Sequence, residues 1–84
     1  MHYDVLSCQV VGPHAIEVAF RDGLTGMVVM EESHCYGVFE PLRDPAVFSE
    51  VRCDQGFLSW GETIDLAPDA MYNAIQKHGQ WVLT

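Results

Sequence analysis

The sequence predicts an α+β fold in two layers, in which an antiparallel sheet precedes a hairpin and helices. Residues 1–30 alternate apolar and polar side chains with a period of two, which is typical of strands that bury one face. Near the other end, Pro68 and Gly79 bracket a segment whose apolar residues recur at helical intervals. A chain of 84 residues has room for one small core, so we expect a single domain over residues 1–84.

The period-two pattern defines the first two predicted strands. The core face of the first strand is expected to carry Leu6, Cys8 and Val10, and Val5 interrupts the alternation. The second strand follows a Gly-Pro turn and is the most regular segment of the chain. Its buried face is predicted to consist of Ile16, Val18 and Phe20.

A tight turn is predicted at Asp22-Gly23, directly after the second strand. Glycine readily takes the positive φ that a two-residue type I′ turn requires, so residues 24–30 are expected to pair back antiparallel. The core side of this third strand would carry Leu24, Val28 and Met30. The three strands together form a three-stranded meander.

The segment after the meander is less regular. Residues 31–41 lack a clear period and predict a loop that covers an edge of the sheet with two apolar side chains, Val38 and Phe39. Asp44 followed by Pro45 is a favoured helix start, so a short helix is expected over residues 45–50. Its buried residues would be Val47 and Phe48.

A two-stranded hairpin and a C-terminal helix complete the prediction. The hairpin is expected from residues 51–53 and 57–60, with Gly56 in its turn. The helix begins at Pro68 and stops at Gly79, and Ala67 at its N-cap has no side-chain acceptor. One face of the helix carries Met71, Ala74, Ile75 and His78. The remaining residues, 80–84, are too few to assign.

The charge of the chain restricts its partners. Twelve acidic residues against four basic ones give a formal net charge of −8, which makes nucleic acid and anionic membranes unfavourable partners. Residues 31–69 hold nine of the acids and two arginines, hence a net charge of −7. Such a charge promotes solubility, and it also complements a small basic protein.

The cysteines and the N-terminus indicate the compartment. The N-terminus shows neither the basic nor the apolar region of a signal peptide, and no apolar run reaches the length of a membrane span. Cys8, Cys35 and Cys53 are odd in number and widely spaced, which fits neither a disulfide framework nor a Cys-x-x-Cys pattern. We therefore expect a cytoplasmic protein.

Cys35 is the strongest candidate for an enzymatic nucleophile, because His34 precedes it and a nearby imidazole lowers the pKa of a thiol. Neighbours in an extended segment usually point apart, however, and no oxyanion or triad motif accompanies this pair. Metal ligands at short paired spacings are also lacking among His2, His14, His34, Cys35, Cys53 and His78. The sequence favours a non-enzymatic domain without catalytic residues, cofactor or metal. The alternative is a small enzyme or metal-binding protein that uses Cys35 with a nearby His.

Several motifs together resemble one bacterial family. They are Phe20-x-Asp22-Gly23, residues 37–45, Phe48, Trp60, and the stretch Asp-Leu-x-Pro-Asp-x-x-Tyr at residues 65–72. Through them the chain resembles the domain of unknown function 2442 (DUF2442) along almost its whole length. The chain departs from the family at the turn after Trp60, where it has Gly61-Glu62-Thr63 in place of the family's frequent turn sequence.

The resemblance implies an α+β domain of short strands with a terminal helix, and it carries over no catalytic residue. Many members are encoded beside another small protein, which implies antitoxin-like pairing. Some carry a helix-turn-helix, which this sequence does not show, so we expect no direct binding to DNA.

The charge and the resemblance together predict a protein-interaction domain, the acidic antitoxin-like half of a two-gene pair. Its partner is expected to be a small basic protein encoded by a neighbouring gene, and a homodimer stays open. Three carboxylates and two aromatic rings are the candidate partner-binding residues: Glu31, Glu32, Glu62, Trp60 and Tyr72. Since a small core needs its large side chains, the two rings have core packing as their alternative role.

Overall fold

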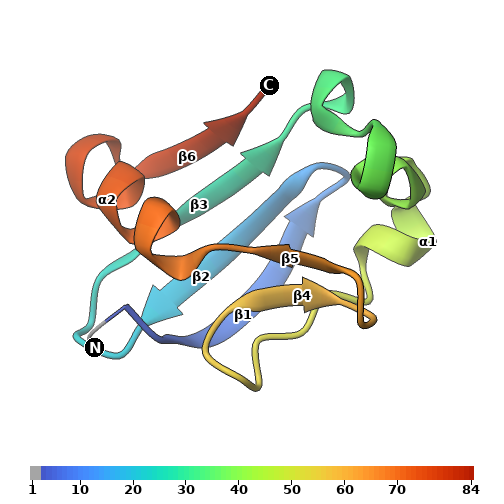
Figure 1. Ribbon diagram of the computed structural model, residues 1–84. Coiled ribbons are helices and arrows are strands. Elements are labelled where there is room, and N and C mark those ends of the chain that lie inside the picture. The colour runs from blue at the N-terminus through green and yellow to red at the C-terminus, as the bar shows by residue number, and fades with distance from the viewer. Residues whose placement is uncertain (1–2) are drawn as a thin grey trace.

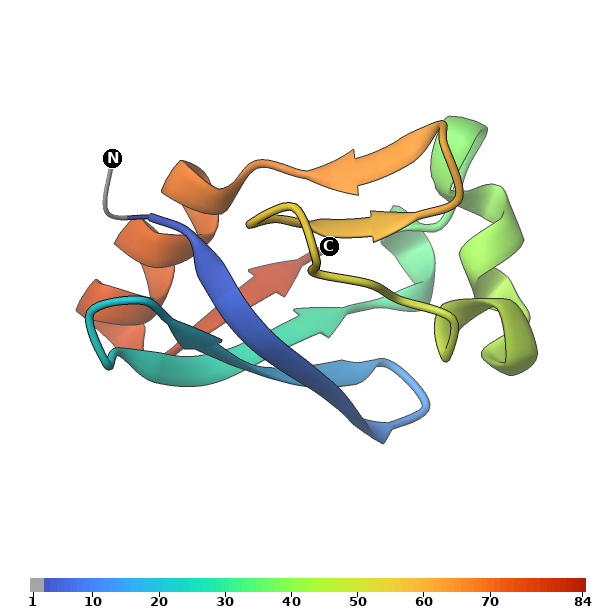
Figure 2. The same ribbon diagram turned by 90° about the horizontal axis from the view of Figure 1, so that it is seen from below.

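In the computed structural model, which describes residues 3–84, the α+β class and the two layers are confirmed (Figure 1). The elements follow one another as β1 (Val5–Gly12), β2 (Ala15–Phe20), β3 (Thr25–Met30), the 3₁₀ helices η1 (Glu32–His34) and η2 (Gly37–Arg43), α1 (Pro45–Phe48), β4 (Leu58–Trp60), β5 (Ile64–Leu66), α2 (Pro68–His78) and β6 (Gln80–Leu83). Seen from below, the β4–β5 hairpin and α2 lie on one side of the larger sheet (Figure 2). Within residues 3–84, no helix is both long enough and apolar enough to cross a membrane.

The larger sheet has the strand order β1-β2-β3-β6. Its first three strands form the predicted antiparallel meander, and β6 adds a fourth strand parallel to β3. The segment 80–84 was too short to assign from its sequence, because four residues carry no measurable period. Its pairing depends on long-range contacts: Met27 N donates to Gly79 O at 3.3 Å, and Glu31 N donates to Leu83 O at 2.8 Å.

A β-bulge in β1 corrects the predicted core face of this strand. Val5 pairs with Phe20 and Ser7 pairs with Ala19, so Leu6 is an extra residue without a partner on β2. The bulge reverses the alternation, and as a result Val5 is 2% exposed whereas Leu6 is 56% exposed. Beyond the bulge, Cys8 and Val10 pack partly buried against the core as predicted.

The turn between β2 and β3 is longer than the predicted two-residue type I′ turn. Phe20 N donates to Leu24 O at 2.8 Å and Gly23 N donates to Phe20 O at 3.0 Å, so three residues form the loop. Gly23 has the expected positive φ, 96°, but among the described residues no residue other than glycine has one. A type I′ turn needs two such residues, and Asp22 does not provide the other.

Residues 31–43 form two 3₁₀ helices where the sequence predicted a loop. Phe39 packs partly buried against the core as predicted, whereas Val38 is 62% exposed and does not pack against it. The Asp44 cap is confirmed, because its Oδ1 accepts a hydrogen bond from Ala46 N at 2.9 Å. Helix α1 is shorter than the predicted 45–50 because it ends at Phe48.

The second hairpin exists, but different strands form it. β4 pairs with β5, and the connecting residues are 61–63. The predicted partner segment, residues 51–53, contributes one isolated bridge: Arg52 N donates to Ser59 O at 2.9 Å, and Ser59 N donates to Arg52 O at 2.8 Å. Residues 52–53 therefore lie along the outer edge of β4.

Helix α2 has the predicted ends. Pro68 begins it, the Ala67 N-cap makes no side-chain hydrogen bond, and Gly79 ends it with φ 78°. Met71 and Ile75 are buried as expected, whereas His78 is exposed. The core lies between the layers and is built from these buried residues: Val5, Ile16, Val18, Phe20, Val28, Met30, Cys35, Leu42, Phe48, Leu58, Trp60, Ile64, Leu66, Met71 and Ile75.

Gly26 on β3 lets α2 approach the sheet closely. A Cβ atom at this position would lie 2.4 Å from Ile75 Cγ2 and 2.8 Å from Gly79 O. We expect Gly26→Ala to lower the free energy of unfolding by about 1–3 kcal/mol, because Ile75 and the helix end must move. Chemical denaturation measures this loss.

Gly12→Ala is the matched control for this substitution. The new Cβ would meet only Ala15 Cβ at 3.7 Å, which is an ordinary contact. Its stability should stay within about 0.5 kcal/mol of the wild type. Equal stability of the Gly26→Ala and Gly12→Ala proteins would contradict the close approach of α2 to β3.

The uncapped start of α2 gives a second prediction. Ala67 is exposed in an extended conformation, so a serine hydroxyl there has room to accept from the first N–H groups of the helix. Ala67→Ser should raise the free energy of unfolding by about 0.5–1 kcal/mol in a denaturant titration. Asp44→Ala is the control in the opposite direction, since it removes an existing cap. A loss of stability in Ala67→Ser would contradict this account of the helix start.

Candidate functional site

A concave polar surface lies on the outer face of the β4–β5 hairpin. Both strands alternate apolar, polar, apolar: Leu58 and Trp60 face the core on β4, and Ser59 between them faces outward. In β5, Asp65 is the outward residue and pairs directly with Ser59. Gly61, with φ 63°, begins the turn that brings the two strands together. The alternation therefore separates a buried apolar face from an outer polar face.

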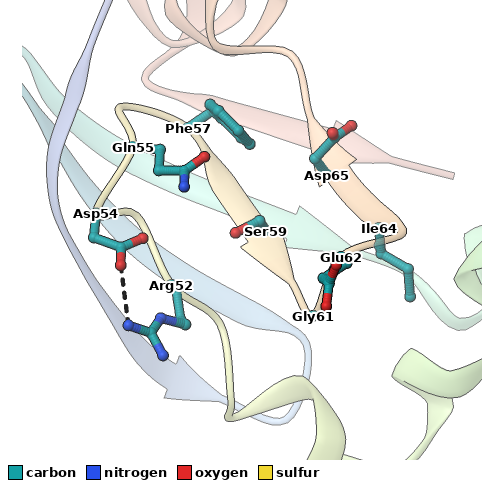
Figure 3. Close-up of a pocket in the computed structure, with 9 residues that line it drawn as sticks. All are labelled: Arg52, Asp54, Gln55, Phe57, Ser59, Gly61, Glu62, Ile64 and Asp65. Atoms are coloured by element: carbon teal, nitrogen blue, oxygen red, sulfur yellow. Dashed lines mark hydrogen bonds and ion pairs between the residues drawn. The ribbon is translucent and has the colours of Figure 1, made fainter.

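This outer face contains a hollow of about 500 Å³, which we call the hairpin hollow (Figure 3). Its lining comes from the hairpin and from the segment before it: Arg52, Asp54, Gln55, Phe57, Ser59, Gly61, Glu62, Ile64 and Asp65. Three carboxylates and one guanidinium leave this surface with a net negative charge. Arg52 Nη2 donates to Asp54 Oδ2 at 3.0 Å, so the single cation is already paired with one of the acids.

The chemistry of the hairpin hollow suits a positively charged side chain. Glu62 and Asp65 are exposed, and neither makes an ion pair among those found in residues 3–84. Phe57 is partly buried at the same surface and offers an apolar and π-electron contact. Lysine and arginine side chains combine a charged end with an apolar stem, so this mixture of acids and an aromatic ring complements them.

The structure does not bring the five sequence-predicted partner residues together. Glu62 is the one that lines the hairpin hollow. Glu31 is exposed immediately before η1, and Glu32 is exposed within it and forms an ion pair with Arg43 at 3.6 Å. Sequence reasoning counted Asp54 and Asp65 in the acidic segment but did not assign them to a site. The apolar-polar-apolar triplets at residues 58–60 and 64–66 were the signal that would have placed their polar residues on one outer face.

Trp60 is a core residue, so of the two roles that the sequence left open for it, partner anchor or core packing, the structure shows core packing. Its side chain is 3% exposed, and its Nε1 donates to Phe48 O at 2.9 Å. The indole also stacks on the Phe48 ring with centroids 5.9 Å apart. These contacts fix the hairpin to α1 and leave the ring no access to a partner in this conformation.

Tyr72 joins α2 to the turn between β2 and β3. Its hydroxyl donates to Asp22 Oδ2, and its ring meets Phe20 edge-on with centroids 5.1 Å apart. The Tyr3 ring also lies against the Tyr72 ring, with centroids 5.0 Å apart. The hydrogen bond to Asp22, followed by burial, raises the pKa of the Tyr72 hydroxyl. Tyr72 therefore has a structural partner, although its side chain remains partly exposed.

Cys35, the candidate nucleophile, is completely buried. Its Sγ donates to Glu31 O at 3.8 Å, and burial raises the pKa of the thiol despite the opposing charge of Arg43. A nucleophilic cysteine needs the opposite arrangement, namely an accessible thiolate. His34 packs instead against Phe39, with ring centroids 4.9 Å apart.

Within residues 3–84, no group of three His, Cys, Asp or Glu side chains is arranged to hold a metal ion. His2, one of the candidate ligands from the sequence, lies outside the described residues. The remaining candidates are distributed over the fold.

The family model described as "Protein of unknown function (DUF2442)" matches residues 5–77 of the chain. The chain belongs to this family. The match includes the hairpin hollow and most of α2, and it confirms the resemblance on which the sequence analysis relied. No curated protein and no solved structure matches this DUF2442 chain.

The hydrogen bond of Tyr72 gives a prediction for high pH. Because the folded state raises the pKa of this hydroxyl above its usual value of about 10, its contribution to stability is complete below pH 10 and is lost as the pH rises further. Wild type should therefore exceed Tyr72→Phe in stability at pH 7, and the difference should narrow above pH 10. Denaturant titrations of both proteins at pH 7 and above pH 10 measure this difference in the free energy of unfolding.

Tyr36→Phe is the matched control, because Tyr36 is 66% exposed. Its stability should follow that of the wild type at neutral pH. A difference between wild type and Tyr72→Phe that grows above pH 10 would contradict the role assigned to the Tyr72 hydroxyl.

Proposed function

We propose that this DUF2442 domain is a non-enzymatic protein-interaction domain that binds a small basic protein at the hairpin hollow. The observation that carries the proposal is the combination of three carboxylates, one internally paired arginine and Phe57 around a single concave surface. Concave surfaces with an apolar contact and a few polar groups are typical of binding sites. The family resemblance supports an antitoxin-like pair, with the partner encoded by a neighbouring gene.

The overall charge supports the same kind of partner. A net charge of −8 attracts a basic protein over distances up to about the Debye length, roughly 8–10 Å in physiological salt. Such attraction mainly increases the association rate, whereas contacts in the desolvated centre of an interface set the dissociation rate. Glu62 and Asp65 are suited to the first role, and Phe57 is suited to the second.

Charge reversal inside the hairpin hollow tests the proposal. The protein encoded beside this chain is the probe, and its binding is measured by surface plasmon resonance at two salt concentrations. We expect Asp65→Lys to weaken binding at least about tenfold, equivalent to about 1.4 kcal/mol, mainly through slower association. Binding by the variant should also depend less steeply on salt.

Glu17→Lys is the matched control, because it changes the charge equally. Glu17 is exposed on β2, in the larger sheet, and pairs there with Gln9 and Met27. It should reduce binding only slightly. An equal loss in both variants would show that net charge alone attracts the partner, and no binding of the neighbouring protein to wild type would contradict the proposed pairing.

Phe57→Ala separates contact from charge. Truncation of this ring should accelerate dissociation and leave the salt dependence unchanged. Because Phe57 is partly buried, thermal melting must first establish that the variant is folded. A folded Phe57→Ala protein with wild-type dissociation would remove Phe57 from the interface.

A further inference from the structure

One face of the larger sheet is uncovered. The β4–β5 hairpin and α2 lie across its inner face, and within residues 3–84 no helix or strand lies across the opposite face (Figure 2). Successive residues of a strand point to opposite sides, so the side chains of this opposite face alternate with the core residues of β2 and β3. We call the surface formed by the outward side chains of β1, β2, β3 and β6 the open sheet face.

An apolar row crosses the open sheet face. Ala15 pairs with Val29 and Val29 pairs with Val82, so three apolar side chains lie side by side on β2, β3 and β6. Met27 lies two residues before Val29 on the same face of β3. Met27, Val29 and Val82 do not pack against the core, and Val82 is 40% exposed. Their apolar surface is therefore open to a partner.

Polar side chains border this row. They occupy the next two cross-strand rows of the sheet: Gln9, Glu17, Gln80, Ser7 and Thr25. Over β1, β2 and β3 this polar end contains a hollow of about 270 Å³. An apolar centre next to polar and mostly uncharged groups is the composition of a protein–protein interface.

The charge of the chain identifies which partner suits the open sheet face. Glu17 is the single charged side chain among the strand residues that point to this face in the described part of the chain. A basic partner gains little there, since the other acids lie elsewhere. Two copies of a chain with a net charge of −8 repel each other, and a nearly uncharged face is where they approach at the lowest electrostatic cost.

The size of the face sets the strength of such a contact. Four strands about 4.8 Å apart, with about six residues of about 3.3 Å each, give a face of roughly 19 by 20 Å. The projected area is roughly 400 Å² per copy, or roughly 800 Å² for a pair. Side chains project from this plane and enlarge the accessible area, which places the pair at the low end of specific interfaces, about 1,200 Å² or less.

We propose that the open sheet face is a homodimer interface, on which a second copy of the chain packs face to face over the row of Ala15, Val29 and Val82. Two sheets pack in this way at a separation of about 10 Å. A twofold axis brings the same surface of both copies together. The dimer is weak and reversible, and it leaves the hairpin hollow accessible. This inference is therefore independent of the basic partner proposed for that hollow.

Salt distinguishes this contact from binding at the hairpin hollow. Added salt shortens the Debye length from about 10 Å at 0.1 M to about 3 Å at 1 M and screens the repulsion between the two acidic copies. The homodimer should therefore become tighter as salt is added. Binding of a basic protein to the acidic hairpin hollow should become weaker, because salt screens attraction there.

The test is sedimentation equilibrium of the whole chain in reducing buffer, at concentrations from about 10 μM to about 1 mM. We expect a reversible monomer–dimer equilibrium whose dissociation constant falls at least about threefold between about 0.05 M and 0.5 M salt. A wild-type chain that stays monomeric at both salt concentrations would overturn the proposal. A dimer that dissociates as salt is added, or a larger assembly, would also overturn it.

Val82→Asp tests the location of the interface. It should weaken the dimer at least about tenfold, because two added carboxylates would face each other across the apolar row. Val38→Asp is the matched control, since it makes the same substitution at a residue that is 62% exposed on η2, outside the sheet. It should dimerise like the wild type. Equal effects of the two substitutions on a folded chain would contradict the open sheet face as the interface.

Glu17→Gln tests the same face without risk to the fold, because the glutamate is exposed. Removal of the one carboxylate on the open sheet face should tighten the dimer more than Glu40→Gln, which removes an equal charge from the exposed surface of η2. If Val82→Asp unfolds the chain, this comparison decides. No gain of Glu17→Gln over Glu40→Gln would overturn the proposal.

Discussion

The contact between α2 and β3 at Gly26 sets the distance between the two layers. Because glycine has no Cβ, Ile75 and the carbonyl of Gly79 settle directly on β3. That position lets Gly79 accept from Met27 N, which places β6 in parallel register beside β3. At its other end, α2 follows β5 after a single residue, so the same contact also positions the β4–β5 hairpin over the sheet. The hairpin hollow thus depends on a packing contact at the other end of α2.

Elements with a strong local pattern were predictable from the sequence. The meander, the Asp44 cap and both ends of α2 each depend on residues close in the chain, and all are present. Elements that depend on a choice between two possible pairing partners were not predictable from the sequence. β4 had two candidate neighbours, and it pairs over three residues with β5 but only through one bridge with Arg52. The bulge at Leu6 was equally hidden, because burying Val5 requires the register of β2.

The candidate sites show the same division between local and spatial information. The acidic character of the middle segment was evident from the sequence. Of the proposed partner residues, however, only Glu62 lines the hairpin hollow, because a count of charges does not show which side chains share a surface. Trp60 and Tyr72 were ambiguous because large rings stabilise cores and interfaces by the same burial.

The two borders of the larger sheet bear on how the protein behaves at high concentration. Unpaired strand edges recruit other chains into extended β-aggregates, and proteins counter this with short or covered edges. Here Gly56 occupies part of the β1 edge through Val5, and the bulge at Leu6 twists the strand next to it. The opposite border is β6, which is only four residues long. Neither border presents a long, regular row of backbone groups, so the fold itself limits aggregation by strand addition.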